Sequence, residues 1–279
     1  MPELPEVETI TRVIEPQIRK LQINHISVYR PEIIAHPGAE DFCRRLTGQI
    51  FDHMERRGKY LIIALKSGDR IILHLRMTGR LLITPADCPI EKHTHLVIRM
   101  SNDRELHFCD TRRFGRFWLL ASGETDTYSG IEKLGIEPLS ANLSAEHLYN
   151  QLGKRKKSIK ECLMDQSVIA GIGNIYSDEI LFTSKIYPAC PACSLTWEEW
   201  SRLAEVIPQC LSFFIRKNAI TPEEYFQTNG QEYRNTPFLQ VYGHENEPCP
   251  FCKTPLRRIV IGGRSSTFCP CCQKSTIIA

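Results

Sequence analysis

Cys249-Pro250-Phe251-Cys252 is followed, after sixteen intervening residues, by Cys269-Pro270-Cys271-Cys272. Paired cysteines at this separation are typical of a structural tetrahedral Zn²⁺ site, because each pair forms a tight turn that directs two thiolates toward one point. The residues between the pairs predict a β-hairpin over 256–261 and 264–268, with its turn at Gly262-Gly263. We therefore expect one zinc ion, bound by Cys249, Cys252, Cys269 and Cys272. A pairing of Cys269 with Cys271 is the less favoured alternative.

Upstream of this module, residues 157–185 predict two short amphipathic helices joined by a turn that contains Gly171 and Gly173. Glycines in such a turn allow a phosphate to approach the backbone closely. Asn174 stands where it either caps the second helix or donates its amide to a phosphate oxygen. Arg264, just past the hairpin turn, is either a surface arginine or a forked phosphate ligand. The residues alone leave both pairs of roles open.

Basic residues are concentrated in two places, although the net charge of the 279-residue chain is only +3. The segment from Cys249 to Ala279 holds five basic residues and no acidic one. Lys154-Arg155-Lys156-Lys157 forms a second basic block. Such clusters suit a polyanionic partner, although a single run is also typical of a solvated face.

The overall composition, with 42% hydrophobic and 24% charged residues, predicts a folded protein. No apolar run approaches 18 residues and the N-terminus lacks a signal-peptide pattern, so we expect a cytoplasmic protein that is nucleoid-associated if it binds DNA. The twelve cysteines then indicate metal binding rather than disulfides. A further pair, Cys190 and Cys193, has no second pair nearby, and we interpret it as a free surface thiol pair.

The N-terminus reads Met1-Pro2-Glu3-Leu4-Pro5-Glu6. Removal of Met1 is expected before a residue as small as proline, and it would leave Pro2 with a secondary amine. Such an amine can attack an electrophilic sugar carbon and form an iminium. Glu3 lies beside it, and Glu6 lies one turn further on if a helix starts here. Because proline and glutamate also suit the first turn of any helix, these residues alone leave a structural role open.

The pattern along the chain changes from strands to helices. Residues 9–21 predict an amphipathic helix that Pro16 should kink or interrupt. Short apolar segments separated by turn signals then predict a β-sandwich or barrel-like domain, and residues 135–140 read as a linker. The expected strands are 23–29, 60–65, 70–75, 81–84, 95–100, 105–109 and 115–120, and the expected helices beyond the linker are 144–151, 158–168, 175–184 and 196–217.

Together, residues 1–9, the segment 165–176 and the terminal four-cysteine hairpin strongly resemble the formamidopyrimidine-DNA glycosylases, in that family's order. The resemblance implies an α+β protein with an N-terminal β-sandwich and N-terminal helix at 1–137, a helix–two-turn–helix domain at 138–243 and a zinc finger at 244–279. DNA would run between the first two domains. The implied activity is base-excision repair: the enzyme flips oxidised purines out of double-stranded DNA, removes them and cleaves the strand by β,δ-elimination. We expect a monomer with structural zinc, no small-molecule cofactor and no membrane contact.

The resemblance also implies roles for individual residues. The catalytic residues would be Pro2, Glu3, Lys59 and Arg264. Pro2 would be the nucleophile that attacks C1′, and Glu3 the acid/base. Lys59 would contact a phosphate near the lesion, and Arg264 together with Asn174 would hold the DNA backbone on either side of the flipped nucleotide. Met77, Arg112 and Phe114 would fill the vacated space, since an apolar wedge replaces stacking while a guanidinium hydrogen-bonds the orphaned base. The other expected DNA-binding residues are Glu6, His74, Lys157 and Tyr242.

The chain departs from the family pattern at 219–230, where a glycine- and Ser/Thr-rich loop over the everted 8-oxoguanine is expected. Thr78 also stands where a lesion-side acidic or small polar residue is expected. Oxidised pyrimidines, the substrates of the endonuclease VIII group, are therefore an alternative, although that group usually opens Pro-Glu-Gly-Pro-Glu and Leu4 favours the purine enzymes. A non-catalytic zinc-containing DNA-binding protein would not need Pro2, Glu3 and Lys59 together. A zinc-ribbon module of transcription or translation would leave the N-terminus unexplained.

Overall fold

The computed structural model describes residues 2–230 and 233–274, which form two compact units. Unit 1 contains the chain up to Glu132 together with Asn218–Arg234, and unit 2 contains Lys133–Lys217 and the chain from Asn235 onward. Removal of Met1 and the last residues of the expected zinc-finger segment, 275–279, lie outside the described residues.

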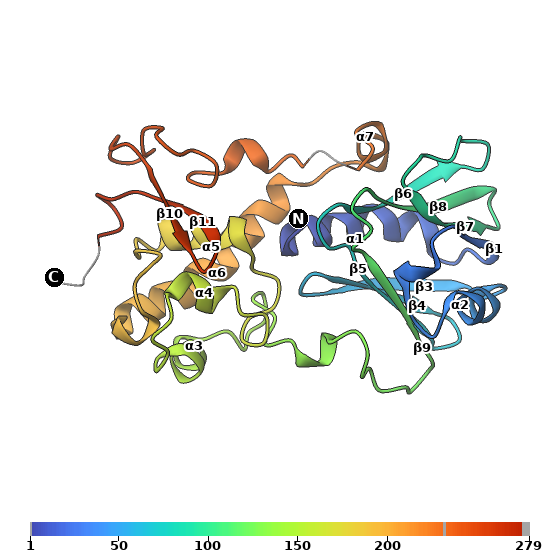
Figure 1. Cartoon of the computed structure of the whole chain (residues 1–279), viewed down its shortest axis with the longest axis horizontal. Helices are drawn as coiled ribbons and strands as arrows, with labels where there is room; N and C mark the ends of the chain where they lie inside the picture. The colour runs from blue at the N-terminus through green and yellow to red at the C-terminus, as the bar shows by residue number, and fades with distance from the viewer. Residues whose placement is uncertain (1, 231–232, 275–279) are drawn as a thin grey trace. The chain divides into compact units, whose positions relative to one another are not determined.

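Unit 1 is a β-sandwich of a four-stranded and a five-stranded sheet (Figure 1). One sheet has the order β1-β7-β8-β6 and the other the order β2-β9-β5-β4-β3; all pairings are antiparallel except that of β2 with β9. Apolar side chains from both sheets share one core, which confirms the predicted sandwich. The strands are β1 (Ile23–Val28), β2 (Ile34–His36), β3 (Phe51–Arg57), β4 (Tyr60–Leu65), β5 (Arg70–His74), β6 (Gly79–Pro85), β7 (Thr94–Met100), β8 (Arg104–Asp110) and β9 (Arg116–Leu120).

Helix α1 (Leu4–Ile18) contacts strands of both sheets and buries its apolar face in their common core. It begins five residues earlier than expected, because Glu3 and Glu6 form a capping box that satisfies backbone N–H groups at its start. Pro16 lies in the last turn rather than the middle of the helix, and α1 ends two residues later. This early start fixes Pro2 and Glu3 at the helix N-terminus.

Several elements of unit 1 were missed by the sequence patterns: the short 3₁₀ turn η1 (Pro31–Ile33), strands β2 and β3, and helices α2 (Ala39–Leu46) and α7 (Pro222–Gln227). Strand β3 buries only Phe51 and Met54 among its seven residues. The alternation of apolar and polar residues that predicts a strand is therefore too weak there to be recognised.

The segment Asn218–Arg234 packs with unit 1, whereas the expected domain boundaries placed it in the helical domain 138–243. Its helix α7 (Pro222–Gln227) contacts α1 and β6, and Tyr225 joins the sandwich core. A capping box between Thr221 and Glu224 starts the helix, with Pro222 in its first turn. The atypical stretch of sequence is thus an ordered, capped helix.

The described part of unit 2, residues 133–217 and 235–274, contains four helices and the terminal β-hairpin (Figure 1). The expected helix 158–168 is too long, since the chain turns after Leu163. The other three expected helices match the observed helices to within one residue at either end. The hairpin turns at Gly262 and Gly263, both with positive φ, as predicted. The elements are α3 (Ala145–Leu152), α4 (Ile159–Leu163), α5 (Asn174–Thr183), α6 (Trp197–Lys217), β10 (Arg257–Ile261) and β11 (Arg264–Phe268), with 3₁₀ turns η2 (Ile131–Lys133, at the unit boundary), η3 (Ala192–Ser194) and η4 (Thr236–Phe238).

In unit 2 the structure excludes one of the two roles left open for Asn174 and corrects the interpretation of Cys190. Asn174 does not cap α5: it is the first helical residue, and Gly173 occupies the cap position. Cys190 is not a surface thiol, because it is buried with its Sγ 3.1 Å from the Ser194 hydroxyl, while Cys193 is exposed.

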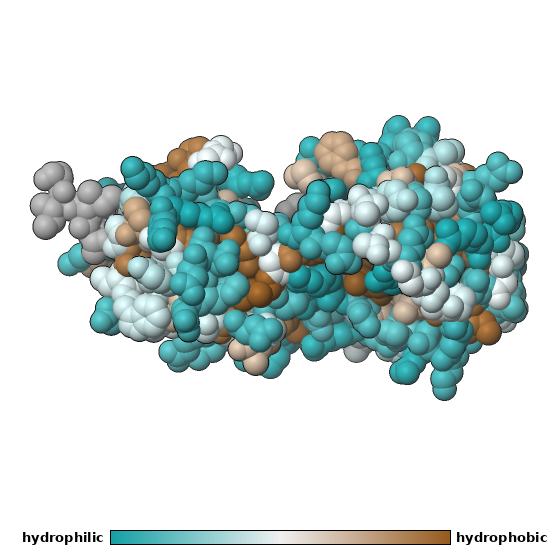
Figure 2. Space-filling model, turned by 90° about the horizontal axis from the view of Figure 1, so that it is seen from below, coloured by the Kyte–Doolittle hydropathy of each residue, from teal (hydrophilic) through white to brown (hydrophobic). Residues whose placement is uncertain are grey.

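The face drawn in Figure 2 is mainly hydrophilic in each unit, as expected when the apolar side chains fill the cores. None of the helices within residues 2–230 and 233–274 has the length and apolar character needed to cross a bilayer.

Candidate functional site

Pro2 lines a pocket of about 330 Å³ in unit 1. Glu3 and Glu6 stand next to it at the start of α1 and are only 2% and 3% exposed. The Glu3 backbone N–H donates to Glu6 Oε2 at 2.8 Å, so the two carboxyl groups are held by the helix cap itself. The pocket wall therefore includes Pro2, which is followed in the chain by the two buried carboxyl groups of the helix cap. Its other lining residues are Met77, Thr78, Gly79, Arg80, His93, Cys109, Asp110, Thr111, Gly230 and Tyr233.

Lys59 lies in the turn before β4, and His74 is the last residue of the neighbouring strand β5. Gly58, with φ +56°, makes the turn between β3 and β4, and Lys59 follows it at only 7% exposure. The His74 ring packs edge-on against the Tyr60 ring, with 4.6 Å between centroids. The Arg76 backbone N–H donates to His74 Nδ1 at 2.9 Å, which leaves Nε2 to carry the ring proton. A neutral imidazole with an Nε2–H donor is suited to a phosphate oxygen.

We predict that His74 stays neutral across pH 5–8. Burial, followed by the charges of Arg76 and Lys59, lowers the pKa of His74 to about 3. Since the unfolded ring has a pKa of about 6.5, the unfolded chain binds more protons below that pH, and stability should fall as the pH drops from 6.5 toward 3. NMR of the imidazole carbons should show no titration of His74 between pH 5 and 8. A midpoint near 6.5 for His74 would contradict the prediction.

Met77, Arg112 and Phe114, expected to fill the space left by an everted nucleotide, come together on one face of unit 1. The Arg112 guanidinium lies 2.8 Å from Met77 Sδ and 4.8 Å from the centre of the Phe114 ring. Met77 and Phe114 are 43% and 45% exposed, which is unusual for large apolar side chains next to a pocket. Two apolar side chains flanking an arginine form a surface on which bases can stack.

Asp110 holds this group in place and was missed by the sequence analysis. Its carboxylate is 1% exposed and accepts hydrogen bonds from the Thr78 hydroxyl, from the backbone N–H of Arg112 at 3.1 Å and from that of Gly115 at 2.8 Å. It therefore ties the loop that carries Arg112 and Phe114 to the residue beside Met77. Thr78, the departure noted in the sequence, serves as one of its donors.

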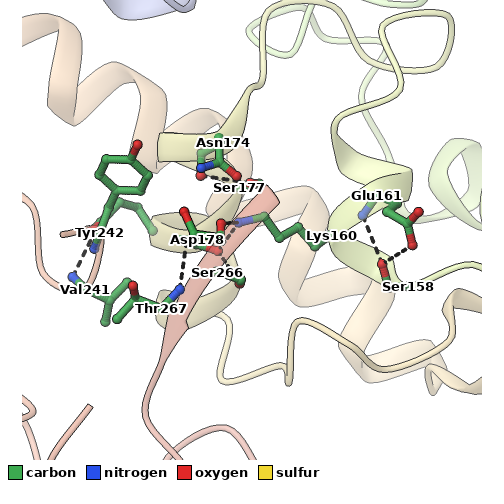
Figure 3. Close-up of polar contacts among 12 residues, drawn as sticks. Ser158, Lys160, Glu161, Asn174, Ser177, Asp178, Val241, Tyr242, Ser266 and Thr267 are labelled. Carbon is green, nitrogen blue, oxygen red and sulfur yellow. Dashed lines mark hydrogen bonds and ion pairs between the residues drawn. The ribbon is translucent and has the colours of Figure 1, made fainter. Parts of the chain in front are cut away.

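In unit 2, a buried carboxylate positions Tyr242. Glu179, 1% exposed on α5, accepts three backbone N–H bonds, from Gln240 at 2.9 Å, Val241 at 3.0 Å and Tyr242 at 2.9 Å (Figure 3 labels the last two). Burial raises the pKa of Glu179, and the three N–H donors act in the opposite direction. Asn174, at the start of the same helix, has a buried Oδ1 without a hydrogen-bond partner in the described structure. A carbonyl oxygen only accepts, so a phosphate at this helix N-terminus would be bound by the Nδ2 amide of Asn174 and by backbone N–H groups.

A buried ion pair joins the helices of unit 2 to the hairpin that carries Arg264. Lys160 Nζ on α4 donates to Asp178 Oδ1 on α5 at 2.6 Å and to the Ser265 carbonyl at 2.9 Å (Figure 3). Asp178 also accepts from the Ser266 hydroxyl at 2.6 Å and the Thr267 backbone N–H at 3.0 Å. Burial raises the pKa of Asp178, while attraction to Lys160 lowers it. The position of exposed Arg264, next to Ser265, therefore depends on this pair.

Replacing Lys160 with methionine should destabilise unit 2 by about 3–5 kcal/mol, because it leaves the buried Asp178 carboxylate without its ammonium partner. Urea unfolding followed by zinc release to a colorimetric chelator would measure the loss. Lys156→Met, at an exposed position, is the control. The double variant K160M/D178N should recover part of the loss, since it removes the unpaired charge. An unchanged unfolding midpoint for Lys160→Met would refute the structural role of the pair.

The four predicted zinc ligands converge in unit 2. The Sγ atoms of Cys249, Cys252, Cys269 and Cys272 all lie within 4.8 Å of one another. The Cys252–Cys269 and Cys249–Cys272 sulfur distances are 3.4 and 3.9 Å, close to the spacing of about 3.8 Å that a tetrahedron with Zn–S bonds of ~2.3 Å requires. Hydrogen bonds from the Thr254 side chain and backbone lower the pKa of Cys252 to about 6, which favours the thiolate. The residues fit a structural zinc, and Cys271 lies outside the set.

Each unit thus assembles its own part of the predicted site. Unit 1 contains Pro2, Glu3, Glu6, Lys59, His74, Met77, Arg112 and Phe114; unit 2 contains Lys157, Asn174, Tyr242, Arg264 and the four cysteines. The supporting residues Asp110, Lys160, Asp178 and Glu179 were missed. The sequence hints at a buried position for Lys160, because this charged residue stands between the apolar residues Ile159 and Cys162. Spacing alone, however, does not show that a lysine is buried.

Comparisons with known proteins agree with this division. Family models match the formamidopyrimidine-DNA glycosylase N-terminal domain over residues 1–117, the formamidopyrimidine-DNA glycosylase H2TH domain over 134–224 and the zinc finger found in FPG and IleRS over 246–274. A formamidopyrimidine-DNA glycosylase of Desulforamulus reducens is 41% identical over 276 residues, which cover 99% of this chain and 100% of the relative.

Solved structures of Lactococcus lactis FPG (MutM) match as well. Its complex with FAPY-dG-containing DNA has a TM-score of 0.90 and 34% identity, and its complex with oxidized-pyrimidine-containing DNA has a TM-score of 0.90 and 33% identity. Each match covers 98% of this chain and 100% of the other.

Proposed function

The chain belongs to the formamidopyrimidine-DNA glycosylase family, and on this premise we propose how its own residues carry out the family's reaction. It is a DNA glycosylase and AP lyase of base-excision repair that acts on oxidised purines in double-stranded DNA. The observation that carries the residue assignment is the placement of Pro2 in a pocket beside two buried carboxyl groups.

Pro2 is the nucleophile. After removal of Met1, its amine attacks C1′ of the damaged nucleotide; an N–C1′ bond forms, the glycosidic C–N bond breaks and the base leaves with a proton. Glu3 supplies the proton that O4′ needs for the sugar ring to open, and the nitrogen lone pair then forms the iminium. The iminium acidifies C2′–H, so loss of that proton breaks the 3′ C–O bond and a second elimination breaks the 5′ C–O bond.

The remaining residues present the nucleotide to Pro2. A base cannot be excised within the stack, and its extrusion costs a few kcal/mol. We assign Met77, Arg112 and Phe114 to the space that it leaves, because their exposed cluster can stack on neighbouring bases while Arg112 hydrogen-bonds the unpaired base. Lys59, His74, Lys157, Asn174, Tyr242 and Arg264 are assigned to backbone phosphates.

The zinc supplies folding energy to the hairpin that carries Arg264. We infer that the enzyme acts as a monomer. We also infer that it works in the cytoplasm at the nucleoid, because its substrate is chromosomal DNA and the relative from Desulforamulus reducens is bacterial.

Oxidised pyrimidines are a second candidate substrate class, since the Lactococcus lactis relative has been solved with DNA that contains one. Single-turnover assays on duplexes with 8-oxoguanine opposite cytosine, an oxidised pyrimidine or an abasic site separate the possibilities. We expect the fastest base excision with 8-oxoguanine and strand cleavage at the abasic site. Faster excision of the pyrimidine would move the preference to the second class. A lack of cleavage on all three duplexes would leave only a DNA-binding protein.

A further inference from the structure

The segment that ends at Gly230 forms part of the wall of the Pro2 pocket. Asn229 and Gly230 both have positive φ, +54° and +62°, and the Gly230 backbone N–H donates to the Tyr225 carbonyl at 2.8 Å. A Cβ at Gly230 would lie only 2.9 Å from the Tyr225 ring, and Tyr225 is anchored in the sandwich core. The end of α7 and the turn after it are therefore held against the pocket by backbone geometry.

One side chain ties this turn to Arg80, another residue that lines the pocket. Glu91 Oε1 accepts from Asn229 Nδ2 at 2.7 Å, and Glu91 Oε2 accepts from Arg80 Nη2 at 2.5 Å. Arg80 lies on β6, lines the pocket and is 11% exposed in its side chain, so its charge is largely removed from water. Each carboxylate oxygen is thus used by a different donor, and we call the three residues the Arg80–Glu91–Asn229 bridge.

We propose that the Arg80–Glu91–Asn229 bridge determines how well the enzyme excises an oxidised purine, by keeping the 222–230 segment closed against the pocket when a base occupies it. The proposal rests on the proposed function and adds a positioning role for residues that do not react. An everted base is held only if the residues that line the pocket, Arg80 and Gly230 among them, lie at contact distance from it. An abasic nucleotide has no base to hold, so cleavage at an abasic site does not require the bridge.

Exchanging hydrogen-bond donors and acceptors distinguishes an effect of the bridge on excision from a general loss of protein stability. Asn229→Asp places two carboxylates face to face, which opens the bridge by repulsion, while aspartate tolerates the left-handed backbone of this position. Adding Glu91→Gln should close it again: the introduced amide N–H donates to the new carboxylate, and the amide carbonyl still accepts from Arg80. The swapped pair thus restores both contacts with the charges exchanged.

Single-turnover rates would be measured for N229D, E91A and E91Q/N229D on 8-oxoguanine and preformed abasic duplexes, with D41N on the surface of α2 as control. N229D and E91A should slow 8-oxoguanine excision about tenfold, the range of coupling expected for interacting side chains, and leave abasic cleavage within about twofold of wild type. E91Q/N229D should recover most of the excision rate. D41N should match wild type on both duplexes.

Equal losses on both duplexes, unchanged excision in N229D and E91A, or no recovery in the double variant would each overturn the proposal. Melting temperatures of the variants confirm that folded protein is compared. Failure of the proposed function is a different result, since wild type would then cleave neither duplex.

Discussion

Pro2→Gly is expected to reduce covalent trapping by borohydride on an abasic duplex by about hundredfold or more. A secondary amine forms an iminium that has no N–H to lose, so it keeps its positive charge and continues to acidify C2′–H. The primary amine of glycine forms an imine that can lose a proton and become neutral.

The measurement compares trapped protein–DNA adduct for wild type and Pro2→Gly, after mass spectrometry confirms that Met1 has been removed from both. A form that retains a residue before Pro2 is the matched control, because its Pro2 nitrogen is an amide and should give no adduct. Wild-type adduct yield from either altered protein would show that another amine is the nucleophile.

Cys249→Ser is expected to abolish zinc binding and to weaken binding to lesion DNA by about hundredfold or more. Cys249 is fully buried with Val241 and Leu256 in the small apolar cluster under the hairpin, so loss of the metal exposes that cluster. Structural zinc contributes an apparent ~10–16 kcal/mol to folding in small modules, far more than so small a core can replace. Arg264 is carried by the same hairpin and would lose its position.

Zinc content by elemental analysis and DNA affinity by fluorescence anisotropy at one fixed salt concentration test this prediction. Cys271→Ser is the matched control, because Cys271 is exposed, lies between the ligands Cys269 and Cys272 in the sequence and is not part of the four-sulfur cluster. It should keep one zinc and wild-type affinity. A Cys249→Ser protein that retains zinc and affinity would disprove the assigned ligand set.

Local patterns predicted most of the secondary structure, and the errors have local causes. The strands 60–65 and 70–75 and the helix 196–217 have strong periodicity, and the structure reproduces them to within one residue at either end. Strand β3 has too few buried positions to show a period, and α1 begins early because the Glu3–Glu6 capping box outweighs the apolar pattern. The capping role that the sequence left open for Asn174 belongs to Gly173, since cap and first-turn positions differ by only one residue.

The sequence by itself determined the chemistry of this protein: an N-terminal proline next to glutamates, and four cysteines at the spacing of a tetrahedral metal site. These features can be recognised because their groups are adjacent along the chain. Only the tertiary structure revealed that Asp110 supports the wedge, that Lys160 and Asp178 hold the hairpin of Arg264, and that Glu91 reaches Asn229. Such contacts join residues up to 138 positions apart, and their strength depends on burial, which no single-sequence pattern encodes.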